Sequence, residues 1–358
     1  MAMNKQVLIS KVNQGITIEN EDLSNIDLSN LNLGGANFSE CDLSGSNLSK
    51  SKFEQVNLIK CDISNVNLKS SIWIDCNIIE CNIDETELSE THFTDINVIN
   101  SSFYKSNLSN SHLQEANFVE CGFNQSSLQE CNLAFASFMQ CNIAAANISS
   151  CNLERTNFIE CDLLGVTFRE SRLQQTIFEK PVIENHDFSN MHLSMTQFRS
   201  AVLNGCNFSG SELSQAAFVE AELKNCVFDN ANIPMGLFSK SALTGSSLKK
   251  CFMEQASLQE CILNQCDFSY SHLLQAQLSS TQCIGTRFSK CELSYADLSM
   301  SIFQSTDLSD TSLVRTNLHG LTDSGSIWSG SSKSLAIGTD EKLEKAQNWQ
   351  PMPAAVEQ

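Results

Sequence analysis

The sequence lacks most of the signals that mark membrane proteins, common enzymes and nucleic-acid-binding proteins. No apolar run reaches the roughly 18 residues that a membrane-spanning helix needs, and the first residues show no secretory signal. The glycine-rich phosphate loop, the HExxH zinc motif and the GxSxG serine motif are all missing. With 22 basic and 41 acidic residues, the net charge of −19 argues against binding to nucleic acids or anionic membranes. The same charge favours basic protein surfaces as partners.

What the sequence has instead is an unbroken five-residue repeat. From Ile18 to Leu318, every residue whose number ends in 3 or 8 is apolar, which makes 61 consecutive units in one frame. On an α-helix, a step of five residues advances by about 140° net, so these side chains would spiral around every side. On a flat strand, an odd period would alternate between the two faces. The repeat therefore predicts a solenoid that turns one corner per unit.

The units Ala36–Glu40, Cys41–Gly45 and Ala296–Met300 resemble the A-(D/N)-L-x-x motif of the pentapeptide-repeat family. The resemblance covers about five-sixths of the chain. It implies an all-β fold, a right-handed quadrilateral β-helix in which four units make one square coil. The central residue of each unit and the residue two positions before it would point inward. About 15 coils, spaced by ~4.8 Å, would then form a rod about 70 Å long.

Three segments are predicted. Residues 1–17 form a lead-in, in which Gln6–Ser10 is expected to be a short strand that covers the open edge of the first coil. Residues 18–318 form the continuous β-helix. Residues 319–358 form a flexible Gly/Ser-rich connection and a short helix with Thr339 as its N-cap.

The end of the solenoid needs a cover, because a terminal coil exposes its apolar interior. Three apolar residues of the last segment are expected to provide it, namely Trp328, Leu343 and Trp349. The alternative is that this tail binds a partner.

Sixteen cysteines would ordinarily suggest a disulfide framework, but fifteen of them occupy the first position of their unit. That position is the small inward slot, which Ala, Ser and Thr fill elsewhere. Cysteines 20 residues apart would stack with parallel Cβ vectors, which is poor disulfide geometry, and no C-x-x-C pair is present for zinc. We therefore expect small buried thiols in a bacterial cytoplasm, with export by a signal-peptide-independent system left open.

The repeat is least regular at Glu179–His186, where Pro181 and His186 both fill the small inward slot. Proline cannot donate a hydrogen bond to a neighbouring strand. Because the five-residue register continues through this stretch, the sequence predicts a local distortion or a bend, and no domain boundary.

The outward position after each centre is usually polar, but on one face it is apolar in six successive coils. At the ~4.8 Å coil spacing, these side chains would form an apolar stripe about 25 Å long, which suggests contact with another protein or a second copy. The alternative is that β-branched residues simply favour strand surfaces. The six residues are Ile59, Ile79, Ile99, Val119, Met139 and Ile159, and the acids predicted beside them are Glu40, Glu80, Glu120 and Glu160.

No catalytic, cofactor-binding or metal-binding residue is predicted. Four histidines fall in one outward column, but with no thiolate or carboxylate partner they are interpreted as solvated: His92, His112, His192 and His272. The favoured function is a non-enzymatic protein-binding scaffold, with a homodimer as one form of it.

Resemblances extend this prediction. The segment Gly338–Pro351 resembles the tails of pentapeptide-repeat proteins associated with bacterial type VI secretion, which would imply an adaptor or chaperone for an effector or spike protein. An alternative follows from the quinolone-resistance members of the family, whose resemblance implies a DNA mimic that binds type II topoisomerase. A third alternative is a secreted bacterial effector.

Overall fold

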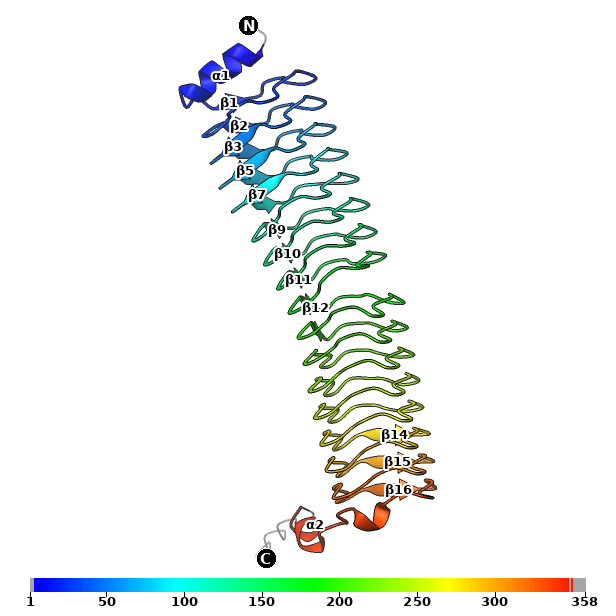
Figure 1. Ribbon diagram of the computed structural model, residues 1–358. Helices are drawn as coiled ribbons and strands as arrows, with labels where there is room; N and C mark the ends of the chain where they lie inside the picture. Colours follow the sequence, from blue (N-terminus) through cyan, green and yellow to red (C-terminus); the bar gives the residue numbers. More distant parts are fainter. Residues whose placement is uncertain (1–2, 348, 350–358) are drawn as a thin grey trace, which may run out of the picture.

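The computed structural model describes residues 3–347 and 349, which form an elongated solenoid with helix α1 at one end and α2 at the other (Figure 1). The fold is an all-β parallel solenoid of about 15 turns, as predicted. Successive coils pair in parallel with a register of 20 residues, for example Phe38 with Leu58 and Leu58 with Ile78. Four units therefore complete one coil.

The short strands form three parallel sheets along the sides of the rod. The ten-stranded sheet contains β1 (Ile18–Glu19), β2 (Asn37–Ser39), β4 (Asn57–Ile59), β6 (Asn77–Ile79), β8 (Asn97–Ile99), β9 (Asn117–Val119), β10 (Ser137–Met139), β11 (Asn157–Ile159), β12 (Ile177–Glu179) and β13 (Gln197–Arg199). The other two sheets are β3 (Lys52–Glu54), β5 (Ile72–Ile74) and β7 (His92–Thr94), and β14 (Gln282–Ile284), β15 (Ile302–Gln304) and β16 (Thr322–Ser324). Elsewhere the coils are joined by isolated parallel bridges.

The interior is filled by the central residues of the units, which are buried along the whole rod. Aromatic residues stack directly above one another, with ring centroids 4.9 Å apart for Phe118 and Phe138 and 5.1 Å apart for Phe138 and Phe158. The predicted aromatic stack is thus packing within one continuous core.

The small inward slot has a second role besides filling space. Its side chains donate hydrogen bonds to the main-chain carbonyl 23 residues earlier, as Thr156 Oγ1 does to Leu133 O (2.7 Å) and Ser246 Oγ to Leu223 O (2.6 Å). Cys131 Sγ makes the same contact with Leu108 O at 3.0 Å. All sixteen cysteines are buried and none is in a disulfide. In this slot cysteine serves as a weak donor that links adjacent coils.

Each corner is made by the fifth residue of the unit, which adopts a left-handed backbone conformation. Most of these residues are not glycine, and they include Glu80 with φ of 54° and Phe135 with φ of 62°. Such a conformation is unfavourable for a residue with a Cβ atom, especially a bulky one. The coil-to-coil hydrogen bonds and the buried centre of each unit must offset this cost in every turn.

The solenoid has one weak junction, which we define as the contact between residues 161–175 and residues 181–195. In the described residues, the parallel bridges that join neighbouring coils on three sides up to the last coil are absent here. Only the pairing of β12 with β13 and of β11 with β12 continues. On two of these sides no backbone hydrogen bond crosses the junction. The rod changes direction near β12 (Figure 1), as the sequence predicted for Pro181 and His186.

The lead-in differs from the prediction of a strand at Gln6–Ser10. It is the α-helix α1 (Lys5–Asn13), and its N-cap is Asn4, whose side chain accepts hydrogen bonds from the amides of Gln6 and Val7. Leu8 and Val12, one helical turn apart, are buried against the first coil. A helix therefore covers the open end of the solenoid.

The C-terminal segment also differs from the prediction. Residues 319–337 are not a flexible connection, because β16 pairs with β15 and Ile337 bridges Asn317. A 3₁₀ turn, η1 (Lys333–Leu335), and the helix α2 (Glu341–Gln347) follow. The N-cap of α2 is Asp340 and not Thr339, since the Asp340 carboxylate accepts from the amides of Lys342 (2.9 Å) and Leu343 (3.2 Å).

Candidate protein-docking face

The six residues of the predicted stripe lie in one straight column, which we call the apolar column. Register pairs Ile59 with Ile79, Ile79 with Ile99 and Ile99 with Val119, and it continues through Met139 to Ile159. Ile59 and Met139 are 38% and 39% exposed, and the other four side chains are half-buried against their neighbours. Six stacked apolar side chains therefore remain accessible on the ten-stranded sheet.

An asparagine ladder runs beside the apolar column on the same strands. Asn57 Nδ2 donates to Asn37 Oδ1 at 2.7 Å, Asn77 to Asn57 at 2.9 Å, and Asn117 to Asn97 at 2.8 Å. These amides make this edge of the face polar but uncharged. This ladder was not predicted, although Asn occupies every twentieth position from residue 37 to residue 117 of the sequence.

The four predicted glutamates lie on the other side of the apolar column, on alternate coils. Each of the four glutamates is separated from the next by a different residue, in the order Glu40, Lys60, Glu80, Asn100, Glu120, Gln140, Glu160 and Lys180. We call these eight residues the charged column. Lys60 Nζ lies 3.8 Å from Glu80, and Lys180 Nζ lies 3.9 Å from Glu160. A lysine or a neutral amide therefore follows every glutamate of the column, so no two acids are adjacent.

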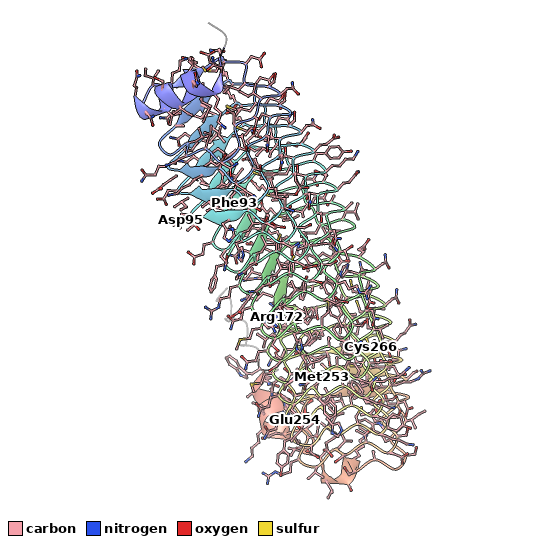
Figure 2. The ribbon with its side chains drawn as sticks, turned by 45° about the horizontal axis from the view of Figure 1, so that its top comes forward. Phe93, Asp95, Arg172, Met253, Glu254 and Cys266 are labelled. Atoms are coloured by element: carbon pink, nitrogen blue, oxygen red, sulfur yellow. The ribbon has the colours of Figure 1, made fainter. Side chains whose placement is uncertain are left out.

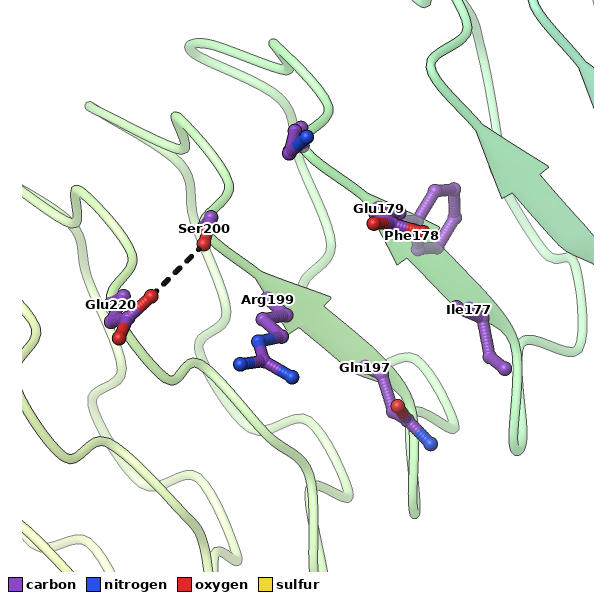
Figure 3. A pocket seen from close by; sticks show the side chains of 8 residues that line it. Ile177, Phe178, Glu179, Gln197, Arg199, Ser200 and Glu220 are labelled. Atoms are coloured by element: carbon purple, nitrogen blue, oxygen red, sulfur yellow. Dashed lines mark hydrogen bonds between the residues drawn. The ribbon is translucent and has the colours of Figure 1, made fainter.

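The ten-stranded face changes character at the weak junction. In the two coils after Ile159, the position that continues the apolar column is occupied by Glu179 and then by Arg199. These two residues line an open hollow of about 500 Å³ together with Lys180, Gln197 and Glu220 (Figure 3). Ser200 donates a hydrogen bond to Glu220 across its rim. The apolar column thus ends in a charged hollow.

A second hollow opens on a neighbouring side of the same junction. It has a volume of about 410 Å³ and is lined by Glu154, Arg172, Gln174 and His192, with Arg172 labelled in Figure 2. Both hollows mix acidic and basic side chains. Neither contains a charged group that is buried, so neither has the shielded environment that perturbs catalytic residues.

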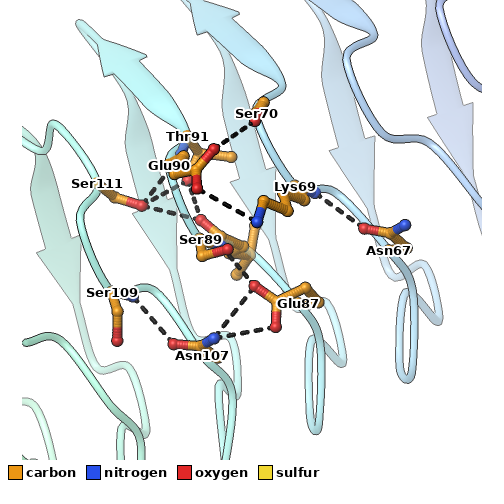
Figure 4. Close-up of polar contacts among 11 residues, drawn as sticks. Asn67, Lys69, Ser70, Glu87, Ser89, Glu90, Thr91, Asn107, Ser109 and Ser111 are labelled. Carbon is orange, nitrogen blue, oxygen red and sulfur yellow. Dashed lines mark hydrogen bonds and ion pairs between the residues drawn. The ribbon is translucent and has the colours of Figure 1, made fainter.

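Many carboxylates elsewhere on the rod make ordinary polar contacts, and Figure 4 shows one group of them. Glu90 accepts from Ser70 Oγ at 2.9 Å and lies 3.2 Å from Lys69 Nζ, and these contacts lower its pKa. Asn107 donates to Glu87 on the adjacent coil at 2.9 Å. Such contacts favour ionised side chains, whereas a general acid needs a raised pKa.

The histidine column is only partly brought together. The rings of His92 and His112 stack with centroids 4.4 Å apart, while His192 and His272 lie on distant coils, His272 stacked on Phe252. Within residues 3–347 and 349, no cluster of three or more His, Cys, Asp or Glu side chains could hold a metal ion. In the same residues, no helix is both long and apolar enough to cross a bilayer.

The residues expected to cap the C-terminal end are arranged differently. Trp328 is partly buried and stacks on Phe303 at 6.3 Å, but Leu343 and Trp349 are exposed. The contact that holds α2 comes from His319, which was not predicted. This buried imidazole accepts from the Asp340 amide through Nδ1 (3.2 Å) and contacts Gln347 Oε1 through Nε2 (3.0 Å).

The coil of four short units, the small inward slot and the corner residues define the class of short-repeat parallel β-solenoids. The chain belongs to the pentapeptide-repeat family. The model described as "Pentapeptide repeat region" matches residues 46–117, 109–178 and 151–228, and the one described as "Pentapeptide repeats (8 copies)" matches residues 22–58, 237–273, 271–310 and 281–320. No curated protein matches the sequence.

Solved structures of pentapeptide-repeat proteins resemble the chain in fold. HetL from the cyanobacterium Nostoc, involved in heterocyst differentiation regulation, is 21% identical, and the match covers 78% of this chain and 96% of HetL with a TM-score of 0.22. QnrB1, a plasmid-mediated fluoroquinolone resistance protein, is 17% identical over 44% of this chain and 84% of its own, with a TM-score of 0.27. Rfr23 from the cyanobacterium Cyanothece is 19% identical over 47% and 98%, with a TM-score of 0.20. At these identities the similarity concerns the fold alone.

Proposed function

We propose that the protein is a non-enzymatic, protein-binding scaffold that docks its partner on the ten-stranded sheet. The observation that carries this proposal is the apolar column, which stands in register on β4, β6, β8, β9, β10 and β11. It is bordered by the asparagine ladder on one side and the charged column on the other. An apolar centre with a polar rim is the usual composition of a protein interface.

The rigidity of this face supports the same function. Each side chain of the column is set by strand pairing with both neighbouring coils, so a partner meets a surface that is already ordered. A preformed surface avoids part of the entropy cost of association. By contrast, the outward apolar residues of another side are interrupted by Glu222, Ala242 and Gln282 and form no continuous patch; they are Val182, Val202, Ile262 and Ile302.

The test is capture of partners from the source bacterium by the full chain and by the double variant Ile79→Asp/Ile99→Asp. We expect the variant to lose the proteins that the wild type retains. The matched control is Ile262→Asp/Ile302→Asp, which places the same charges at two exposed isoleucines of another side and should retain them. Equal capture by all three proteins would exclude the apolar column as the docking site.

The more specific proposal of a type VI secretion adaptor or chaperone rests on the resemblance of the tail. It is tested by removing residues 339–358 and comparing the captured proteins. Truncation at residue 320 would be unsuitable, since residues 321–337 complete the last coil. Loss of an effector or spike component on truncation would support this role, and an unchanged set would contradict it.

The alternative of a topoisomerase-binding DNA mimic is supported by the net charge of −19 and the rod shape. A rod of about 70 Å matches about 20 base pairs in length. The apolar column and the lysines of the charged column do not resemble a phosphate backbone. A gyrase supercoiling assay with excess protein decides the question, because a DNA mimic must inhibit or protect the enzyme and a scaffold of another kind would have no effect.

A further inference from the structure

We propose that the occupant of the ten-stranded face is a second copy of this chain, paired antiparallel about a two-fold axis that passes between Ile99 and Val119. This inference rests on the proposed function, because it names the partner of the same face. The order of residues along the apolar column and the order along the charged column both favour this pairing.

A two-fold axis parallel to the strands places the second copy with its long axis reversed. Each residue of the second copy keeps its position along the strand direction. Each column therefore faces the same column of the second copy, read in the opposite order. With the axis between Ile99 and Val119, the six apolar residues pair completely. The pairs are Ile59 with Ile159, Ile79 with Met139, and Ile99 with Val119, and each occurs twice in the dimer.

The charged column shows the same complementarity in this register. Glu40 faces Lys180 of the second copy, and Lys60 faces Glu160. The two inner pairs join a carboxylate to a neutral side chain, Glu80 to Gln140 and Glu120 to Asn100. No two like charges face each other over eight coils, which favours the arrangement because like charges at a rim oppose association.

The neighbouring registers do not have this property. Moving the axis by half a coil to Ile99 brings Glu40 against Glu160 and Glu80 against Glu120. Moving it to Val119 brings Lys60 against Lys180 and Glu80 against Glu160, and it also places Ile59 against Glu179. The charges therefore select the one register that pairs all six apolar residues.

The surroundings and size of the face fit a reversible dimer. On the asparagine side, Asn97 would face Asn117 and Asn57 would face Asn157, while Asn77 would face Ser137 and Asn37 would face Ile177. Amides and hydroxyls can both donate and accept hydrogen bonds. Eight coils about 38 Å long and about 15 Å wide would bury roughly 1,200 Å² in total, at the lower end of the range for specific interfaces. We expect dissociation in the micromolar range.

Analytical ultracentrifugation of the full chain, over micromolar to near-millimolar concentrations, tests the pairing. Lys60→Glu places a glutamate against Glu160 twice per dimer, and Glu160→Lys places a lysine against Lys60 twice. Each single variant should dimerise about tenfold more weakly or worse. When the two variants are mixed, each altered residue meets an opposite charge, so a dimer of wild-type affinity should return.

The matched control uses a pair with the same geometry outside the paired face. Lys240 Nζ lies 3.9 Å from Glu260, at the same position of the repeat as Lys60 and Glu80. Lys240→Glu and Glu260→Lys should leave the dimer unchanged. Recovery on mixing requires the antiparallel register, since loss of folding in either variant cannot be repaired by the other.

Two outcomes would overturn the proposal: a wild-type chain that stays monomeric at all concentrations, or a dimer that neither single variant weakens. Neither outcome removes the scaffold function. If the wild type is monomeric and still loses captured proteins through Ile79→Asp/Ile99→Asp, the face binds a different protein. If the captures are also unchanged, both proposals fail.

Discussion

The imidazole of His186 packs against the phenyl ring of Phe188, with centroids 4.3 Å apart, and edge-on against Phe168 at 5.5 Å. Its Nε2 is buried without a hydrogen-bond partner in the described part of the chain. The rings of Phe168 and Phe188 are 6.3 Å apart, against 5.0 Å for Phe188 and Phe208 one coil further on. His186 thus separates two coils from inside, because a large ring fills a slot suited to Ser, Cys or Ala.

Replacing this ring with a slot-sized residue should let the coils close. We expect His186→Ser to raise the free energy of unfolding by about 1 kcal/mol, since it removes both the overpacking and the unpartnered nitrogen. Hydrogen exchange of the Phe168 and Asp187 amides, which have no backbone acceptor in the structure, should slow in the variant. His192→Ser, an exposed substitution on the same coil, is the control, and a destabilised His186→Ser protein would contradict the interpretation.

His186 should also make stability depend on pH. Burial lowers its pKa from the ordinary 6.5, opposed by the smaller influence of Asp187, so the unfolded chain takes up the proton at a higher pH than the folded chain does. The contribution of His186 is therefore constant above pH 6.5, falls as the pH decreases below that value, and levels off below the folded pKa. Denaturant titrations of the wild type and His186→Ser should diverge most at the acidic end of this window. Parallel pH profiles would contradict the assignment.

The thiols should be inert while the protein is folded, because all sixteen are buried away from a reagent. This holds also for Cys81 and Cys161, whose pKa is lowered by hydrogen bonds with the thiols of Cys61 and Cys141. Burial raises the pKa of Cys206 and Cys226 to about 12. At pH 8 such a thiol is ionised in about one molecule in ten thousand, compared with about one in four for a free cysteine. Mass spectrometry after brief alkylation should show no modification of the native protein and sixteen labels after unfolding. Rapid labelling of a cysteine before unfolding would show that its coil opens locally.

The attachment of α2 should depend on His319. His319→Ala removes both contacts of the imidazole, to the Asp340 amide and to Gln347, and α2 has no buried residue of its own to hold it. Trypsin should then cut faster after Lys342 and Lys345, while the solenoid stays intact. His272→Ala, at an exposed position, is the control. Cleavage at the wild-type rate would mean that α2 is held by something other than this histidine.

The solenoid could be predicted because its signal repeats in every unit. Apolar centres such as Leu113 and small slots such as Cys131 each follow a period of five, and the register of 20 follows from four units per coil. The same arithmetic placed the apolar column correctly. It also gave the position of the weak junction, because Pro181 and His186 are the residues least suited to their slot.

The ends could not be predicted in this way, since they depend on contacts that do not repeat. At the N-terminus, Leu8 and Val12 have the four-residue spacing of a helix, but a run of Val7, Leu8 and Ile9 also suits a strand. After Leu318 the centre positions are no longer regularly apolar, since Asp323 is polar and only Trp328 still packs on the core. The backbone still pairs there, because the exposed edge of the preceding coil supplies the hydrogen-bond partners.

The weak junction divides the molecule mechanically. In a solenoid each coil contacts only its neighbours, so tension along the axis passes through every coil-to-coil contact in series. At the weak junction, most of the hydrogen bonds between coils lie on the β11–β12–β13 side of the rod, where the phenylalanines also stack. Pulling or torsion should therefore open the opposite side first and leave two stiff blocks, residues 18–175 and 181–337, turning about a single edge.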